Sequence, residues 1–300
     1  MKIKNLFSLR KWIGYFLTKP IAKKISDKSY LKLEFYANMG RCLNLNSPQT
    51  FNEKLQWLKL YDRKPEYTTM VDKYEVKKLV ADLIGEEYII PTLGVWDSFD
   101  EIDFDALPDQ FVLKCTHDSG GLAICRSKST FDKNTAKIKI ERAMKRDYFS
   151  VHREWPYKNV KPRIIAEKYM QDKGNLDLQD YKFYCFNGEP KFLYVSKGLS
   201  NHATARINFV SLDWEKMPFR RTDYAEFDEL PPKPKNFDLM IEFAKKLSAN
   251  IPFLRVDFYD INDKLYFGEL TFFPGAGLTA LTPTEWDSKL GEWIDLPTKP

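Results

Sequence analysis

The chain has 300 residues, of which 43% are hydrophobic and 30% are charged, and its formal net charge is +5. This composition can bury the core of one large domain or of two to three small ones, and no apolar run approaches the roughly 18 residues of a membrane-spanning helix. Residues 1–28 hold eight Lys or Arg and one acid, whereas the rest holds 39 basic and 41 acidic residues. The body of the protein therefore lacks the charge of a nucleic-acid-binding surface.

Residues 1–70 are expected to form a basic, mainly helical N-terminal region. Near its start, Leu6, Leu9, Ile13, Phe16 and Leu17 recur at helical spacing. A stripe of this kind most often packs on its own domain or on a partner. Together with the surrounding lysines, it also suits peripheral contact between residues 1–28 and an anionic membrane.

The first twenty residues lack both the continuous apolar stretch and the small-residue cleavage site of a secretory signal peptide. The four cysteines are scattered without a CxxC pair, which is typical of reduced thiols in the cytoplasm. We therefore expect a cytoplasmic protein, and peripheral attachment at the inner membrane face is a further expectation.

Helix signals continue along the chain. Thr50-Phe-Asn-Glu53 is a capping-box pattern, and Asp72-Lys-Tyr-Glu75 has the same form. A short strand is predicted at Tyr88–Pro91. We treat residues 71–106 as a short linker subdomain.

Strand signals dominate residues 107–172. The segments 110–115 and 122–127 read as strands on either side of the small-residue loop 116–121, a helix is predicted at 134–148, and a strand at 163–170. Such a loop offers backbone N–H groups to phosphate oxygens, with Lys114 as a nearby point charge. The alternative is an ordinary hairpin loop beside a paired lysine.

Residues 173–300 read as further strands and one helix. The segments 180–186 and 189–197 flank Asn187-Gly188, a strong hairpin signal. A strand is predicted at 206–210 and a helix at 237–249. The order of elements indicates an α+β fold whose strands are largely antiparallel.

The segment 253–277 contains a second hairpin. If its turn is centred on Asp263, Asp257 lies opposite Glu269, and Arg255 lies opposite Thr271. Two carboxylates that converge on one face need a cation. The alternative is a solvated strand face with two unrelated acids.

Three features taken together carry a resemblance to a known family. They are a lysine before a Gly-rich hairpin loop, the segment Glu-Lys-Tyr-Met about fifty residues later, and the Asp–Glu strand pair near the end. In this order they resemble the ATP-grasp superfamily, and more closely the TupA-like ATP-grasp proteins of bacterial cell-surface polysaccharide loci. The resemblance runs from about Phe51 to Pro283.

The resemblance implies an ATP-grasp fold, in which two α+β subdomains grip ATP between antiparallel sheets. It makes 107–172 the nucleotide-flap subdomain and 173–300 the metal-binding subdomain with the tail. ATP would be bound by Lys73, Lys114, Ser119, Gly120, Gly121, Glu167, Lys168, Tyr169 and Met170. Magnesium would be held by Asp257, Glu269 and Thr271, and the catalytic residues would be Lys182, Arg206 and Arg255.

Two departures from the superfamily pattern bear on function. Thr271 stands where an asparagine usually gives a third metal contact. The usual N-terminal Rossmann-like subdomain is not evident in residues 1–70, which leaves the binding of the acceptor open. The segment Pro274–Gly277 is a candidate acceptor loop.

By resemblance, we expect a magnesium- and ATP-dependent ligase that forms an amide through an acyl phosphate. Its expected substrates are an amino acid or other amine and a uronic acid or similar group, free or part of a lipid-linked glycan, in a capsule or cell-surface polysaccharide precursor. One alternative is an ATP-grasp kinase acting on a sugar hydroxyl. Another is a glycosyltransferase-associated assembly protein without ATP dependence.

Overall fold

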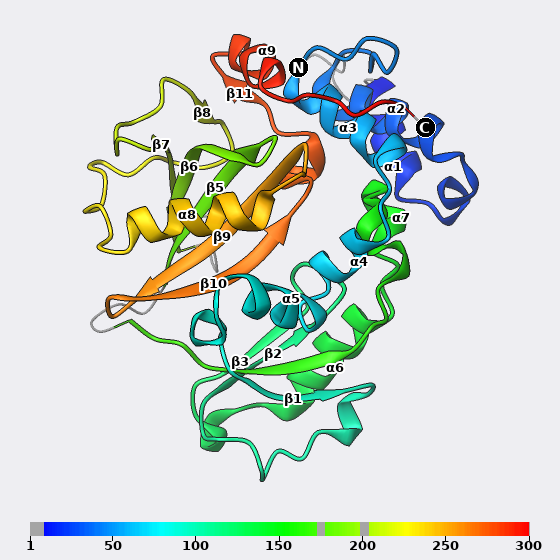
Figure 1. Cartoon of the computed structure of the whole chain (residues 1–300). Helices are drawn as coiled ribbons and strands as arrows, with labels where there is room; N and C mark the ends of the chain where they lie inside the picture. Colours follow the sequence, from blue (N-terminus) through cyan, green and yellow to red (C-terminus); the bar gives the residue numbers. More distant parts are fainter. Residues whose placement is uncertain (1–8, 173–177, 199–203, 300) are drawn as a thin grey trace, which may run out of the picture.

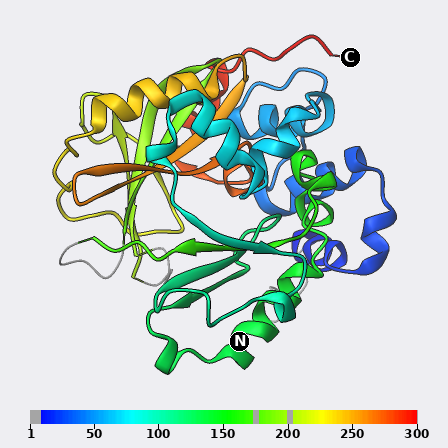
Figure 2. The same ribbon diagram turned by 60° about the horizontal axis from the view of Figure 1, so that its bottom comes forward.

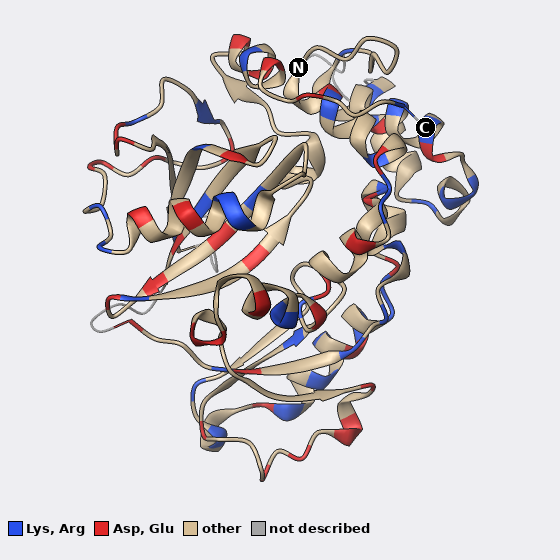
Figure 3. Ribbon diagram, viewed as in Figure 1, with Lys and Arg blue, Asp and Glu red and all other residues tan. Residues whose placement is uncertain are grey.

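Two antiparallel sheets, each covered by helices, form the body of the protein in the computed structural model, which describes residues 9–172, 178–198 and 204–299 (Figure 1). The smaller sheet has the strand order β1-β4-β2-β3, and the larger has the order β10-β9-β5-β6-β7. Figure 2 shows the smaller sheet below the larger one, with the N-terminal helices beside both. Lys, Arg, Asp and Glu are interspersed over both parts in the view of Figure 3.

The first part of the chain is helical, as the sequence predicts. Its helices are α1 (Leu9–Leu17), α2 (Asp27–Met39), α3 (Phe51–Tyr61), α4 (Glu66–Val71) and α5 (Glu75–Ile84). The predicted capping box of α3 is confirmed, because the side chains of Thr50 and Glu53 each accept a hydrogen bond from the other residue's backbone N–H. Phe51 packs edge-on against Phe253 of the larger sheet, with ring centroids 4.9 Å apart. α3 is therefore an internal helix that joins the N-terminal region to that sheet.

The smaller sheet consists of β1 (Thr92–Trp96), β2 (Phe111–Cys115), β3 (Leu122–Cys125) and β4 (Ile164–Lys168). The prediction of a strand at Tyr88–Pro91 is wrong, because a 3-10 turn occupies Glu86–Tyr88 and the strand begins after Pro91, which has no N–H to donate to a ladder. The helix predicted at 134–148 is α6 (Lys133–Met144), which ends four residues earlier than predicted, and the short helix α7 (Phe149–His152) follows beyond the predicted range. α6 contacts β2 and β3 and so covers this sheet.

The larger sheet consists of β5 (Gln179–Phe186), β6 (Glu189–Lys197), β7 (Arg206–Ser211), β9 (Phe253–Ile261) and β10 (Lys264–Thr271). Asn187 and Gly188 both have positive φ, of 50° and 85°, as the predicted tight turn between β5 and β6 requires. α8 (Phe237–Ser248) packs on β5, β6 and β9. The remaining elements are β8 (Arg220–Arg221), β11 (Leu281–Thr282) and α9 (Glu285–Glu292).

The β9–β10 hairpin pairs the predicted residues, but its turn differs from the predicted one. Its turn is the two-residue pair Asn262-Asp263, both with positive φ, and not a turn centred on Asp263. That turn alone would place Asp257 opposite Gly268. A bulge at Gly268 shifts the register by one, so that Asp257 pairs with Glu269 and Arg255 with Thr271.

Two hydrophobic cores lie beneath these sheets. The larger contains side chains from α2–α5, from the larger sheet and from α8 and α9. The smaller contains β2–β4 and α6, together with Phe99 and Ile102. Residues 1–70 and 173–300, which the sequence divides into separate regions, thus share one core. Part of the predicted linker 71–106 belongs to the smaller core, because β1 pairs with β4.

Candidate functional site

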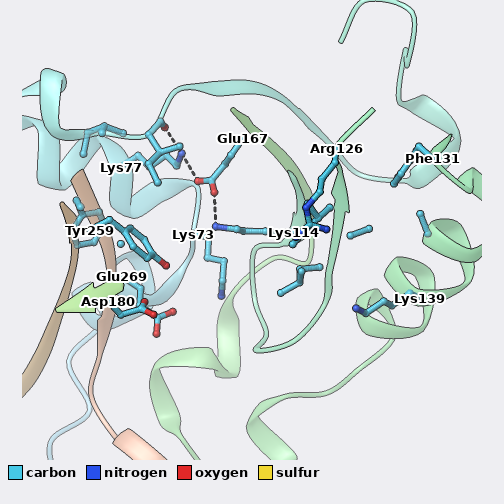
Figure 4. Close-up of a pocket in the computed structure, with 18 of the residues that line it drawn as sticks. Lys73, Lys77, Lys114, Arg126, Phe131, Lys139, Glu167, Asp180, Tyr259 and Glu269 are labelled. Atoms are coloured by element: carbon cyan, nitrogen blue, oxygen red, sulfur yellow. Dashed lines mark hydrogen bonds and ion pairs between the residues drawn. The ribbon is translucent and has the colours of Figure 1, made fainter. Parts of the chain in front are cut away.

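A cavity of about 980 Å³ lies between the two sheets (Figure 4). The helix α5, the smaller sheet and the larger sheet all contribute walls to it. Its apolar walls include Val76, Ile90, Leu122, Ile124 and Phe267. Its polar lining includes Lys73, Lys77, Lys114, Arg126, Glu167, Asp180, Lys182, Tyr259 and Glu269.

Glu167 stands between two lysines on one wall of this cavity. Its Oε1 lies 2.5 Å from Lys77 Nζ, and its Oε2 lies 2.6 Å from Lys114 Nζ (Figure 4). Burial raises the pKa of Glu167, but the charges and hydrogen bonds of the two lysines outweigh it and lower that pKa to about 2. The carboxylate therefore stays ionised and holds Lys114 at the cavity edge.

The loop 116–121 is attached to the site through Lys73. Lys73 Nζ donates to the carbonyl oxygen of Asp118 at 2.6 Å, and Arg146 donates to that of Ser119 at 3.3 Å. A side chain at Gly121 would collide with Asp118 and Ala143, and Gly120 has φ +94°. The glycines therefore let the loop turn close to Lys73.

Asp257 and Glu269 lie beside two cations. Arg255 donates from Nε and Nη2 to the two oxygens of Asp257 at 2.7 and 2.6 Å, and from Nη2 to Glu269 at 2.9 Å. Lys182 Nζ lies 2.7 Å from Asp257 and 3.0 Å from Asp180. The three acids and two cations leave one net negative charge. Partial loss of hydration in the cavity raises the pKa of Glu269, but the charges of Arg255 and Lys182 outweigh it and lower that pKa to about 2.

Magnesium is implied by the family resemblance, and the donor chemistry here fits it. Mg²⁺ takes oxygen ligands, commonly one or two carboxylates with substrate phosphates and water. The Glu269 side chain is 45% exposed, and its Oε2 accepts no hydrogen bond from the described residues. Asp257 is buried, and both its oxygens are bonded to Arg255 or Lys182. An ion that binds both carboxylates would therefore compete with Arg255 or Lys182 for the oxygens of Asp257.

A second cavity of about 600 Å³ opens beside the first. In the described part of the chain, Lys73 and Glu269 are the two residues that line both cavities. The second cavity is also lined by Tyr148, Glu154, Tyr157, Arg221, Arg255, Thr271 and the segment Gly275-Ala276. The two cavities therefore meet at a lysine and a carboxylate.

The segment Pro274–Gly277 is held in place by α3. Gln56 Nε2 donates to the carbonyl oxygens of Ala276 and Gly277 at 3.0 and 2.8 Å. Lys59, which is fully buried, donates to the carbonyl oxygens of Ala276 and His152 at 2.8 and 2.9 Å. The helix α3 thus holds the segment Gly275-Ala276, which lines the second cavity.

Not every predicted residue reaches these cavities. Arg206 is exposed at the start of the edge strand β7, where it pairs with Lys197 at the end of β6, so the structure separates it from the site. Lys168 uses its N–H to bond Pro91. The side chains of Lys168, Tyr169 and Met170 lie outside the lining of both cavities, as do Gly120 and Gly121, whereas Ser119 lines the second.

Sequence reasoning missed several lining residues. Lys77 lies in the first turn of α5, four residues after Lys73, which precedes that helix, so its closeness to Lys73 in the sequence was a signal. Asp180 stands two residues before Lys182 on the same strand, and alternation puts the two on one face. Glu154 follows no motif, and only the fold brings it to the second cavity.

Comparison with known proteins gives one family match. The model described as TupA-like ATPgrasp matches residues 53–295. No curated protein matches the chain.

Several solved structures are similar to the chain. D-alanine–D-alanine ligase from Helicobacter pylori has a TM-score of 0.45 and 14% identity over 84% of this chain and 68% of that one. The ATP-grasp ligase PsnB with its minimal precursor has a TM-score of 0.39 and 10% identity over 73% of this chain and 58% of that one. D-alanine–D-alanine ligase from Bacillus anthracis complexed with ATP has a TM-score of 0.38 and 17% identity over 68% of this chain and 55% of that one. The chain thus spans between 55% and 68% of the length of these proteins.

Proposed function

Because the chain belongs to the TupA-like ATP-grasp family, we propose that it is an ATP- and magnesium-dependent carboxylate–amine ligase that forms an amide through an acyl phosphate. The chain has the α+β ATP-grasp fold of that family. The observation that carries the proposal is the meeting of two cavities at Lys73 and Glu269. One cavity would hold the phosphoryl donor and the other the acceptor, so the transferred group would sit at their junction.

The first cavity suits ATP. Its volume of about 980 Å³ is at the upper end of ordinary ligand pockets. Apolar side chains on both walls can sandwich adenine, while Lys114 and Lys73 lie toward the junction, where phosphate oxygens need cations. Glu167 ion-pairs with Lys114 and so positions its ammonium group.

Phosphoryl transfer depends mainly on positioning and charge stabilisation. Magnesium, held by Glu269, Asp257 and Thr271, would neutralise charge on the phosphates. Lys73 would contact the transferred phosphoryl group from the other side of the junction. The loop 116–121, which Lys73 holds through Asp118, would exclude water, because an acyl phosphate exposed to water hydrolyses.

The acceptor carboxylate would bind in the second cavity. Arg255 lines that cavity, and its Nη1 makes no hydrogen bond within the described ranges, which leaves a donor for an acceptor oxygen. Family resemblance suggests a uronic acid or similar group of a cell-surface polysaccharide precursor, free or lipid-linked, in the cytoplasm. A volume of about 600 Å³ accommodates a monosaccharide unit.

Helix α1 supports a proposal of peripheral membrane contact. Leu9, Trp12, Tyr15 and Phe16 are exposed, with exposed fractions between 39% and 64%. Exposed aromatic residues on a basic helix suit the interface of an anionic membrane. The predicted stripe begins at Leu6, which lies outside the described residues. No helix in the described ranges has the length and hydropathy to cross a membrane.

Thermal unfolding with Mg-ATP tests the nucleotide part of the proposal. A ligand at 100 times its Kd stabilises the folded state by about 2.7 kcal/mol, so Mg-ATP should raise the Tm of the wild type. Lys114→Ala should reduce that shift, whereas Lys128→Ala, outside both cavities, should retain it. An unchanged Tm with Mg-ATP would argue against both the ligase and the kinase. A phosphosugar formed without free phosphate would identify the kinase.

A further inference from the structure

Glu154 is an acid of the second cavity that pairs with no cation among the described residues. Three carboxylates of the described chain line this cavity. Glu269 is paired with Arg255, and Asp223 is paired with Arg221 at 2.6 Å. Glu154 is only 5% exposed and lines the cavity, and its side chain has no hydrogen bond or ion pair with any residue in the ranges that the structure describes. A carboxylate that opens onto a cavity without a protein partner is available to a ligand cation.

The surroundings of Glu154 identify the kind of partner that is missing. Tyr148 and Tyr157 line the same cavity, with ring centroids 4.6 Å apart. Their hydroxyl groups form no hydrogen bond within the described part of the chain, so each can accept one. A carboxylate and two hydroxyl groups present three acceptors, and a primary ammonium group has three donors.

Burial and neighbouring charges act on Glu154 in opposite directions. Burial raises the pKa of its carboxyl group, and the charges of Lys59 and His152 lower it again in part. Lys59 is a poor ion-pair partner for it, because the ammonium group of Lys59 is bonded to the carbonyl oxygens of His152 and Ala276. A carboxyl group in such a site can both bind an ammonium group and take a proton.

We propose that Glu154, with the hydroxyl groups of Tyr148 and Tyr157, forms the binding subsite for the primary amine co-substrate and that Glu154 is the base that deprotonates it. The base role rests on the proposed ligase function. The position is consistent with that role, because Glu154 lines the same cavity as Arg255 and Glu269 at the acceptor end.

The proton balance of the step is complete. Glu154 takes one proton from the bound ammonium group, which frees the nitrogen lone pair. That pair forms the C–N bond to the acyl carbon, and the bond from this carbon to the phosphate oxygen breaks. Phosphate leaves with the electrons of that bond and with the second proton of the nitrogen, which gives the amide, hydrogen phosphate and protonated Glu154.

Ligand-observed NMR tests the subsite without requiring turnover. The probes are glycine, L-alanine, L-glutamate, L-lysine and glucosamine, each beside its N-acetyl derivative, with the full-length protein and magnesium AMP-PNP at pH 7. At least one free amine should bind the wild type, and its N-acetyl derivative should bind about tenfold more weakly or not at all, since acetylation removes the charge. This comparison needs no variant.

Glu154→Gln should weaken binding of the same amine by about tenfold or more and leave AMP-PNP binding intact. The matched control is Glu34→Gln, because Glu34 is equally buried but is bonded to His152 and does not line the cavity. Binding of no free amine, equal binding of the N-acetyl derivatives, or unchanged affinity in Glu154→Gln would each overturn the proposal. An amine that binds through Glu154 without amide formation would sink only the ligase function.

Discussion

At the scale of single residues, ion pairs and hydrogen bonds hold the charged side chains and the loop of the site in place. Lys114 is positioned by Glu167, Asp257 by Arg255 and Lys182, and the loop 116–121 by Lys73. The sequence predicted most of these residues through the family resemblance. It did not reveal most of their pairings, because those of Lys114, Lys182 and Lys73 join groups that are distant along the chain. It also grouped Arg206 with the catalytic residues, although the strand of Arg206 lies at the far edge of the sheet.

Lys73 is the residue whose loss should affect transfer most. Lys73→Ala removes the cation at the junction of the two cavities and the contact that holds the loop at Asp118. We expect roughly a 100-fold or greater fall in the rate of ATP consumption, as for loss of a charge-stabilising group. Lys78→Ala is the matched control, because Lys78 lies on α5, which begins just after Lys73, and its side chain is 82% exposed. Equal rates in the two variants would contradict the role of Lys73.

Glu167 should make stability depend on pH. Its folded pKa of about 2 lies below the usual value of 4.5, so ionised Glu167 stabilises the folded state above about pH 4.5, by on the order of 3 kcal/mol. This contribution falls as the pH drops toward 2. The gap in unfolding free energy between the wild type and Glu167→Gln should therefore be larger at pH 7 than at pH 3 in urea denaturation. Glu242→Gln, at an exposed pair, should show little gap; the same gap for Glu167→Gln at both pH values would refute the ion-pair explanation.

At the scale of secondary-structure elements, the β9–β10 hairpin shows what a sequence can and cannot predict. The prediction paired Asp257 with Glu269 correctly but from a wrong turn, and the bulge at Gly268 compensated for the difference. Turn chemistry is visible in Asn262-Asp263, whereas a bulge depends on how strands twist and pack. The strand prediction at 88–91 is wrong because the apolar residues there line a cavity and do not pair in a sheet.

Gly268→Ala tests the bulge. A Cβ at this position would lie 3.0 Å from the carbonyl oxygen of Asp257 and 3.2 Å from the ring of Tyr259. We expect a loss of about 1–3 kcal/mol in unfolding free energy and weaker Mg-ATP binding, because the register that places Glu269 opposite Asp257 is disturbed. Gly14→Ala is the control, because nothing lies near a Cβ there. Unchanged stability and nucleotide binding in Gly268→Ala would show that the bulge has no such role.

At the scale of the whole molecule, the N-terminal helices share the larger core, and Gln56 and Lys59 hold Ala276, which lines the second cavity. The sequence left open how an acceptor could bind without a Rossmann-like subdomain. We propose that the segment Pro274–Gly277, held by α3, takes that place; sequence patterns do not contain this arrangement because it depends on contacts more than 200 residues apart.

The exposed face of α1 should control membrane contact. We expect the wild type to sediment with vesicles rich in phosphatidylglycerol at low salt and to be released at high salt. Trp12→Glu combined with Phe16→Glu should reduce the bound fraction several-fold, while Ile138→Glu, at an apolar residue of α6 that is 70% exposed, should not. Equal sedimentation of both variants, or no binding by the wild type, would exclude this role for α1.

If the two cavities act together to activate a carboxylate, an oxygen atom of that carboxylate passes to the released phosphate. Following this transfer with oxygen-18 is the most direct test. A panel of uronic acids labelled with oxygen-18 in the carboxyl group would be incubated with the protein, Mg-ATP and an amine mixture, and the released phosphate analysed by mass spectrometry. An acyl-phosphate ligase passes one carboxylate oxygen to phosphate, so we predict one label per phosphate and one amide per ADP. Phosphate without label, or a phosphorylated sugar without free phosphate, would contradict the ligase mechanism.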